Sequence, residues 1–278
     1  MGEASEAWEF SEEPPGVDER IRRFRLRDEV DTFAIRSDRM VVVVDTMSTP
    51  ADGRRLRAAV EPELDGRTLV VVDTHADYDH AWGNQAFSDV PIIGHAICGA
   101  RLQGAAAYED LERWKSNMPG RFDEVVPTPP SILFGDAGLV LDGGDLTIEL
   151  IPTPGHTDDH ASLYVPELDL VLAGDAAEVP FPHVHTGAGL VRARASLQRL
   201  MTLGARHVLP CHGGTTDPVV LERNLAWLDA VAADPDLSYE DALAQFGDGR
   251  PDVLEMYRSF HADACGAARE LEQPPGVR

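Results

Sequence analysis

Apolar residues in the first half of the chain either alternate with polar ones or gather in short runs. Residues 24–38 and 39–49 are rich in β-branched side chains, which predicts strands. Residues 51–64 place Leu56, Val60 and Leu64 at helical spacing, so a helix is expected there. Residues 68–75 then indicate a strand buried on both faces. A short helix from about Ala81, a strand over 90–95 and a charged helix over 106–118, a candidate lid, are expected to follow.

The second half repeats this style without repeating the sequence. Residues 131–156 hold strands separated by glycine-rich turns, and residues 162–175 indicate a hairpin. A helix over 192–204 precedes a last strand and loop over 207–214, and the chain turns helical beyond Pro218. Strand and helix alternate in two successive halves, which favours two sheets packed together with helices outside.

No linker separates these halves, so the sequence predicts one main domain with two appendages. An acidic, proline-containing arm is expected over residues 1–23 and the main domain over residues 24–216. Residues 217–278 are expected to form a C-terminal helical extension packed on the same domain.

Composition narrows the compartment and the partners. The N-terminus is acidic and unlike a secretory signal, and the three cysteines form no CxxC pair. A reducing cytoplasm is therefore expected. The formal net charge of −24 disfavours nucleic acid and anionic lipid as partners. The acidic surface is expected to be a solvated coat, with a specific cationic partner as the alternative. A small-molecule substrate is the partner we expect. Composition leaves the oligomeric state open, with a homodimer as one alternative.

Imidazole and carboxylate side chains follow several strand-like runs at the point where loops leave a sheet. The first run is followed by HADYDH, and later runs by GHT, GD and CHGG. These side chains are ligands for divalent transition metals, and there are too many of them for one tetrahedral ion. They suit two ions sharing a carboxylate. The residues concerned are His75, Asp77, Asp79, His80, His156, Asp175 and His212.

The ordered set of motifs resembles the metallo-β-lactamase superfamily, whose pattern is HxHxDH, then Gly-His, a strand-end Asp and a late Gly-His. The resemblance covers about residues 25 to 215 and implies an α+β fold, a four-layer αββα sandwich. It implies one ion held by His75, Asp77 and His156. It implies a second ion held by Asp79, His80 and His212, with Asp175 bridging the two. Asp79 and a metal-bound hydroxide are the catalytic groups that the resemblance implies.

Asp77 departs from the family pattern, because it stands where a second histidine is usual. Its carboxylate makes the site one unit more negative, which weakens the expected Lewis acidity and the attraction for anionic substrates. Two divalent ions are expected, with zinc first and manganese or iron as alternatives, since oxygen ligands favour harder ions.

Further side chains are candidates for the substrate pocket or for supporting roles. Cys211 is expected to be a small buried residue, with a soft metal ligand as the alternative, and Asp73 is expected to orient a metal ligand. His95 and His160 are expected to cap, pack or support the site. The pocket candidates are Trp82, Phe181, His183 and His185, although core or lid packing is the favoured interpretation for the two aromatic residues.

These observations favour a metal-dependent hydrolase acting on an ester, thioester, lactone or amide of a small molecule. The alternatives are an iron-dependent oxidoreductase, either persulfide dioxygenase-like or diiron, and a phosphodiesterase on the same fold. A binding module that has lost catalytic activity is the fourth interpretation. No motif in the sequence selects the substrate.

Overall fold

The computed structural model describes residues 10–27, 29–248 and 255–272, and the chain divides into two compact units. Unit 1 comprises Met1–Phe134 and Asp142–Leu146, and unit 2 comprises Gly135–Leu141 and Thr147–Arg278. The chain therefore passes between the units three times within a short stretch. The sequence shows no linker at these crossings, so the division into two units was not part of the predicted main domain over residues 24–216.

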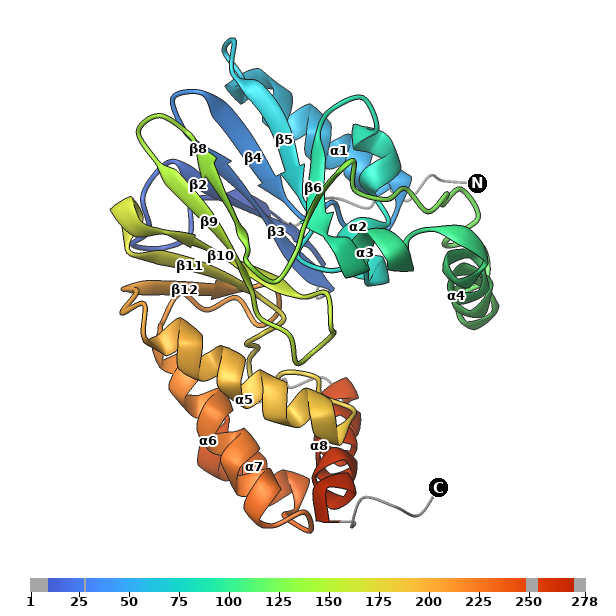
Figure 1. The fold of residues 1–278 in the computed structure, drawn as a ribbon, viewed down its shortest axis with the longest axis vertical. Helices are drawn as coiled ribbons and strands as arrows, with labels where there is room; N and C mark the ends of the chain where they lie inside the picture. The colour runs from blue at the N-terminus through green and yellow to red at the C-terminus, as the bar shows by residue number, and fades with distance from the viewer. Residues whose placement is uncertain (1–9, 28, 249–254, 273–278) are drawn as a thin grey trace. The chain divides into compact units, whose positions relative to one another are not determined.

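A seven-stranded mixed sheet forms the centre of unit 1 (Figure 1). The strands lie in chain order, antiparallel from the first to the fourth and parallel from the fourth to the seventh. Val41–Val44 and Val71–Val72 are fully buried, which explains why their sequence is a continuous apolar run. The strands are β1 (Phe10–Glu12), β2 (Ile21–Leu26), β3 (Val30–Arg36), β4 (Met40–Val44), β5 (Thr68–Val72), β6 (Ile92–His95) and β7 (Ile132–Phe134).

The beginning of this sheet corrects the predicted acidic arm. β1 and the first residues of β2 lie within residues 1–23, and Phe10–Glu12 pairs with Arg23–Arg25 of β2. The strand pairing is hidden in the sequence because β1 is only three residues long and a Pro- and Glu-rich turn follows it. Residues 1–9 of the predicted arm lie outside the described residues.

Along the chain, the helices of unit 1 connect its successive strands from β4 to β7. Thr49 caps the first helix by accepting a hydrogen bond from the backbone N–H of Asp52, 3.2 Å away. Leu56 and Val60 are among its buried residues. The second helix begins at Tyr78, three residues before the expected start at Ala81, because Asp77 takes the extended conformation of an N-cap. These elements are α1 (Pro50–Val60), η1 (Glu61–Glu63), α2 (Tyr78–Ala81), η2 (Asn84–Phe87), α3 (Ala96–Arg101) and α4 (Gly104–Asn117).

A five-stranded sheet forms the first layer of unit 2, with the order β12-β11-β10-β9-β8. β9, β10 and β11 are antiparallel neighbours, while β11 and β12 run parallel. The predicted hairpin is present as β10 and β11, joined by a short turn that ends at Asp169 with a positive φ of 47°. The elements are β8 (Leu139–Asp142), β9 (Thr147–Pro152), β10 (Ala161–Val165), η3 (Pro166–Leu168), β11 (Leu170–Gly174) and β12 (His207–Pro210).

Within its described residues, unit 2 is completed by four helices (Figure 1). These helices share one apolar core with the sheet of unit 2. Phe181 and Trp227 stack at 4.6 Å in that core, and both are fully buried. The helices are α5 (Gly187–Met201), α6 (Val219–Ala233), α7 (Tyr239–Phe246) and α8 (Met256–Glu272). The described part of the predicted C-terminal extension is thus helical, and its α6 and α8 pack against α5. Among the described helices, none combines the length and the apolar composition that crossing a membrane requires.

Residues 142–146, which follow the first residues of unit 2 along the chain, complete unit 1. The backbone N–H of Arg39 donates to the carbonyl of Gly143 at 2.9 Å, and the N–H of Asp38 donates to the Asp145 carboxylate at 2.7 Å. The Arg20 guanidinium also reaches Asp145, at 2.7 Å. Residues 142–146 are therefore held to unit 1 by specific polar contacts.

Candidate metal centre

The loop after β5 and the short helix α2 carry the ligand group of unit 1, which comprises His75, Asp77, Asp79 and His80. His75 and His80 are fully buried, and Asp79 is 8% exposed. The Nε2 atom of His75 lies 3.6 Å from Oδ2 of Asp77, and that of His80 lies 3.6 Å from Oδ2 of Asp79. These separations are too long for hydrogen bonds. Two ligands of a tetrahedral ion with bonds of about 2.1 Å lie about 3.4 Å apart, so these N···O separations fit pairs of atoms facing one metal.

The ligand group of unit 2, which comprises His156, Asp175 and His212, has the same spacing. The Oδ2 atom of Asp175 lies 3.6 Å from Nε2 of His156 and 3.4 Å from Nε2 of His212. One carboxylate oxygen therefore lies near two imidazole nitrogens at the distances expected between ligands of one metal ion. The donor set of nitrogen and carboxylate oxygen suits Zn²⁺, Mn²⁺ or Fe²⁺.

Asp45, directly after β4, orients the histidines of unit 1, and the sequence-based prediction did not include it. It is fully buried, and its Oδ2 accepts the Nδ1–H of His80 at 2.8 Å. Oγ1 of Thr74 donates to Asp45 at 2.8 Å and lies 3.0 Å from Nδ1 of His75. These contacts place a proton on Nδ1 of both rings, which makes Nε2 the atom that can bind a metal. The prediction gave the orienting role to Asp73, a carboxylate that accepts a hydrogen bond from Asn84 at 2.7 Å.

A sequence signal for Asp45 does exist. Residues 43–46 and 71–74 both read VVDT, and they end two adjacent parallel strands. Because the carboxyl ends of parallel strands meet at one sheet edge, this repetition indicates that Asp45 lies beside the residues that follow β5.

The unit-2 ligands are oriented by a comparable network. The Nδ1–H of His156 donates to the carbonyl of His183 at 3.0 Å. His160 accepts the backbone N–H of Asp175 on Nε2 at 2.9 Å, while its Nδ1 lies 2.9 Å from Oγ1 of Thr153. His160 thus holds the backbone of a ligand, in agreement with the supporting role expected for it. His95 caps α3 by accepting the N–H of Ile97.

Asp77 has a cationic neighbour that the sequence did not indicate. Nη2 of Arg101, at the end of α3, lies 2.5 Å from Oδ1 of Asp77, on the carboxylate whose Oδ2 faces His75. The guanidinium offsets the extra negative charge that Asp77 brings to the unit-1 ligand group. The weaker attraction for anionic substrates expected from Asp77 alone therefore needs correction, because the charge count must include Arg101.

Glu178 is a further acidic residue beside the unit-2 ligands, and no motif indicated it. Its side chain is buried, and one ligand atom from each of His156, Asp175 and Glu178 lies within 4.8 Å of the others. Burial raises the pKa of the Glu178 carboxyl to about 7; His212 and His156 oppose the shift and Asp175 adds to it.

The pocket candidates have different positions. Trp82 is 3% exposed and packs edge-on against Phe122, and Phe181 is fully buried, so both lie in the cores of their units. His183 pairs with Asp263 at 2.9 Å, and burial lowers its pKa. His185 is exposed. Cys211 is buried, in agreement with the small buried residue that was expected.

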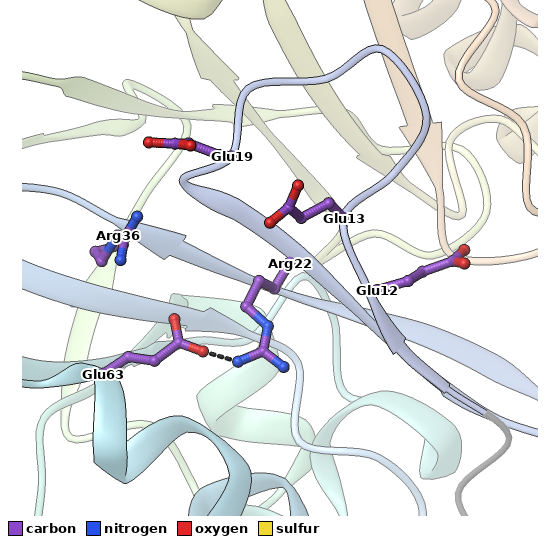
Figure 2. Close-up of a pocket in the computed structure, with 6 residues that line it drawn as sticks. All are labelled: Glu12, Glu13, Glu19, Arg22, Arg36 and Glu63. Atoms are coloured by element: carbon purple, nitrogen blue, oxygen red, sulfur yellow. Dashed lines mark ion pairs between the residues drawn. The ribbon is translucent and has the colours of Figure 1, made fainter.

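A separate hollow of about 540 Å³ lies on unit 1 (Figure 2). Arg22 forms an ion pair with Glu63 across it. Carboxylates outnumber the cations among its lining residues, which are Glu12, Glu13, Glu19, Arg22, Arg36 and Glu63. The residues that line this hollow include no histidine or cysteine, so it lacks the nitrogen and sulfur ligands that a zinc site would need.

Comparison with known proteins agrees with this picture. The family model of the metallo-beta-lactamase superfamily matches residues 26–212, and the chain belongs to that superfamily. The fold is that of a metallo-beta-lactamase family protein from Thermus thermophilus, with a TM-score of 0.61 and 24% identity, over 87% of this chain and 89% of that one. The predicted fold class is thereby confirmed, with two mixed sheets, flanking helices and C-terminal helices.

Two curated relatives carry names that describe an activity. A hydroxyacylglutathione hydrolase from Brucella canis is 27% identical over 164 residues, which are 56% of this chain and 53% of that protein. An acyl-coenzyme A thioesterase from Gallus gallus is 30% identical over 166 residues, 52% of this chain and 57% of that protein. The chain thus spans about half the length of these relatives.

Proposed function

We propose that the protein is a metal-dependent hydrolase that cleaves esters and thioesters of small molecules. Thioesters are the substrates we expect it to prefer. The observation that carries this proposal is the spacing of 3.4–3.6 Å between histidine nitrogens and carboxylate oxygens in both ligand groups. The names of the two curated relatives support thioesters, since each describes the hydrolysis of an acyl-sulfur bond.

Two divalent ions are part of the proposal. The ligands would be His75, Asp77, Asp79, His80, His156, Asp175 and His212, and the way they combine around two ions is taken from the family pattern. When bound, such ions supply a Lewis acid and a water of lowered pKa, which is the chemistry that attack on a carbonyl needs. Zinc is the first choice, and the carboxylates keep manganese and iron as alternatives.

The chain's own residues prepare this chemistry. Asp45 and the His183 carbonyl fix the rings of His80 and His156 with Nε2 available to a metal. Arg101 holds one oxygen of Asp77 while the other faces His75. Asp79 is buried beside His80 and is the carboxylate we assign to ordering the attacking water.

The test is a hydrolysis panel on protein stripped by a chelator and reloaded with Zn²⁺, Mn²⁺ or Fe²⁺. Chromogenic acyl thioesters, esters, lactones, amides and phosphodiesters are each offered without oxygen, with His156→Ala as the control. We expect thioester hydrolysis that needs metal and is lost in the control. Oxygen consumption with Fe²⁺ and no anaerobic hydrolysis would refute the proposal in favour of the oxidoreductase.

A further inference from the structure

Glu178 is held rigidly on the loop that follows β11. Its backbone N–H donates to Oδ1 of Asn224 at 2.9 Å, and Nδ2 of Asn224 donates back to the Glu178 carbonyl at 2.9 Å and to that of Pro180 at 3.0 Å. Asn224 is itself buried on α6. This clamp fixes the point from which the Glu178 side chain extends.

The Glu178 carboxylate is directed into the unit-2 ligand group. It is 1% exposed, and ligand atoms of His156, Asp175 and Glu178 all lie within 4.8 Å of one another. Its oxygens accept the backbone N–H of His183 at 3.3 Å and the hydroxyl of Tyr257 at 3.4 Å. Both donors are uncharged and both bonds are long, whereas a buried carboxylate is stable only beside positive charge or strong donors.

We infer that Glu178 is a further ligand to the ion that His156 and Asp175 hold, an inference that rests on the metal site of the proposed function. Two ligands of a tetrahedral ion with bonds of about 2.1 Å lie about 3.4 Å apart, so each separation in the cluster needs to close by at most about 1.4 Å. Rotation about the side-chain bonds of Glu178 supplies such a movement. The two weak hydrogen bonds to Glu178 oppose it little.

This ligand changes which metal the site prefers. With Glu178 the unit-2 group offers two carboxylates, and oxygen ligands favour Mn²⁺ and Fe²⁺ relative to Zn²⁺. The family pattern gives this part of the chain one carboxylate, Asp175. Glu178 therefore adds to the shift toward harder ions that Asp77 already suggests in unit 1.

The competing interpretation is that Glu178 only anchors its loop, and Glu178→Gln separates the two. The amide oxygen of Gln can still accept the His183 N–H, and the amide nitrogen can donate to the hydroxyl oxygen of Tyr257. The anchoring contacts survive, while the negative charge and the ligand strength are lost. Glu222→Gln, an exposed position in the first turn of α6, is the matched control.

The experiment titrates metal-free protein with Zn²⁺ and with Mn²⁺ in competition with a chromophoric chelator. We expect Glu178→Gln to bind at least one ion about 10-fold or more weakly, with a larger loss for Mn²⁺ than for Zn²⁺. Glu222→Gln should match the wild type. Wild-type affinities for both ions in Glu178→Gln would overturn the inference.

Two further variants make every outcome decisive. If Glu178→Gln does not fold, Glu178→Asp keeps the charge but withdraws the carboxylate by one methylene; an intermediate loss supports the inference and wild-type affinity overturns it. His156→Ala separates this inference from the proposed function. If His156→Ala weakens binding and the Glu178 variants do not, only the inference fails. If none of the variants weakens binding, the metal site itself fails.

Discussion

Asp45→Asn is the substitution that most directly tests how the unit-1 ligands are organised. In the native protein Oδ1 of Asp45 accepts the backbone N–H of Thr74 at 2.7 Å, and Oδ2 accepts the Nδ1–H of His80 at 2.8 Å. An asparagine has one oxygen for these two donors. If the oxygen serves Thr74, the amide N–H faces Nδ1 of His80 and forces the imidazole proton onto Nε2. The metal-binding atom of His80 is then blocked.

The size of the effect follows from the loss of the hydrogen bond that orients His80. Removing the hydrogen-bond partner of a metal-bound histidine lowers metal affinity by about 10- to 100-fold. That range corresponds to about 1.4–2.7 kcal/mol. The loss should fall on the ion held by His80, so a titration should show one weakened equivalent of metal and one unchanged. Competition of metal-free protein with a chromophoric chelator for Zn²⁺ measures both.

The matched control for Asp45→Asn is Asp31→Asn. Asp31 is 2% exposed in the same sheet and pairs with Arg25 at 2.6 Å. Its replacement makes the same change in size and charge but does not touch a histidine ligand, so it should alter stability and leave affinity intact. Wild-type Zn²⁺ affinity in a folded Asp45→Asn protein would refute the assignment of Asp45 as the residue that sets the His80 tautomer.

Three further predictions address the rest of the molecule. His156→Ala and His212→Ala should each lower the metal content of purified protein, measured by mass spectrometry; unchanged content in both would contradict the ligand assignment. Asp77→Asn should weaken one equivalent of metal by calorimetry, whereas Asp77→His should shift preference toward Zn²⁺; identical titrations would mean that Asp77 is no ligand. The hydrogen bond from Arg20 lowers the pKa of the Asp18 carboxyl below 3.8, so the pair stabilises the fold above that pH and the contribution disappears as pH falls. Arg20→Met removes this pair together with the contact to Asp145, so it should reduce the free energy of unfolding at neutral pH by about 1 kcal/mol and flatten its decline below about pH 4, as chemical denaturation across pH would reveal.

Strand ends explain why the ligand positions could be anticipated from the sequence. A polar residue directly after a buried run must leave the sheet at its carboxyl edge, and the residues after β5 and β11 do so. That inference needs only the local sequence, namely an apolar run followed by polar residues. The resemblance of the ordered motifs to a known family then indicated the fold.

Residues whose roles depend on distant neighbours could not be anticipated in the same way. Arg101 reaches Asp77 from a helix that begins after another strand, and Glu178 is placed by Asn224, 46 residues later. Their local sequence contains no signal for either contact. β1 was missed for a related reason: a three-residue segment is too short to show a strand pattern, and it is recognised as a strand only by its pairing with β2.

The interleaving of the two units has a consequence for biosynthesis. As the chain leaves the ribosome, residues 1–134 emerge first, but Arg20, Asp38 and Arg39 meet their partners only when residues 142–146 have followed. By then residues 135–141, which belong to the other unit, have already been made. A nascent chain stalled at residue 134 should therefore be cleaved faster by protease than one stalled far enough on to expose residue 146. For the same reason, no single cut of the gene separates the two units cleanly, because a fragment with all residues of one unit also carries residues of the other.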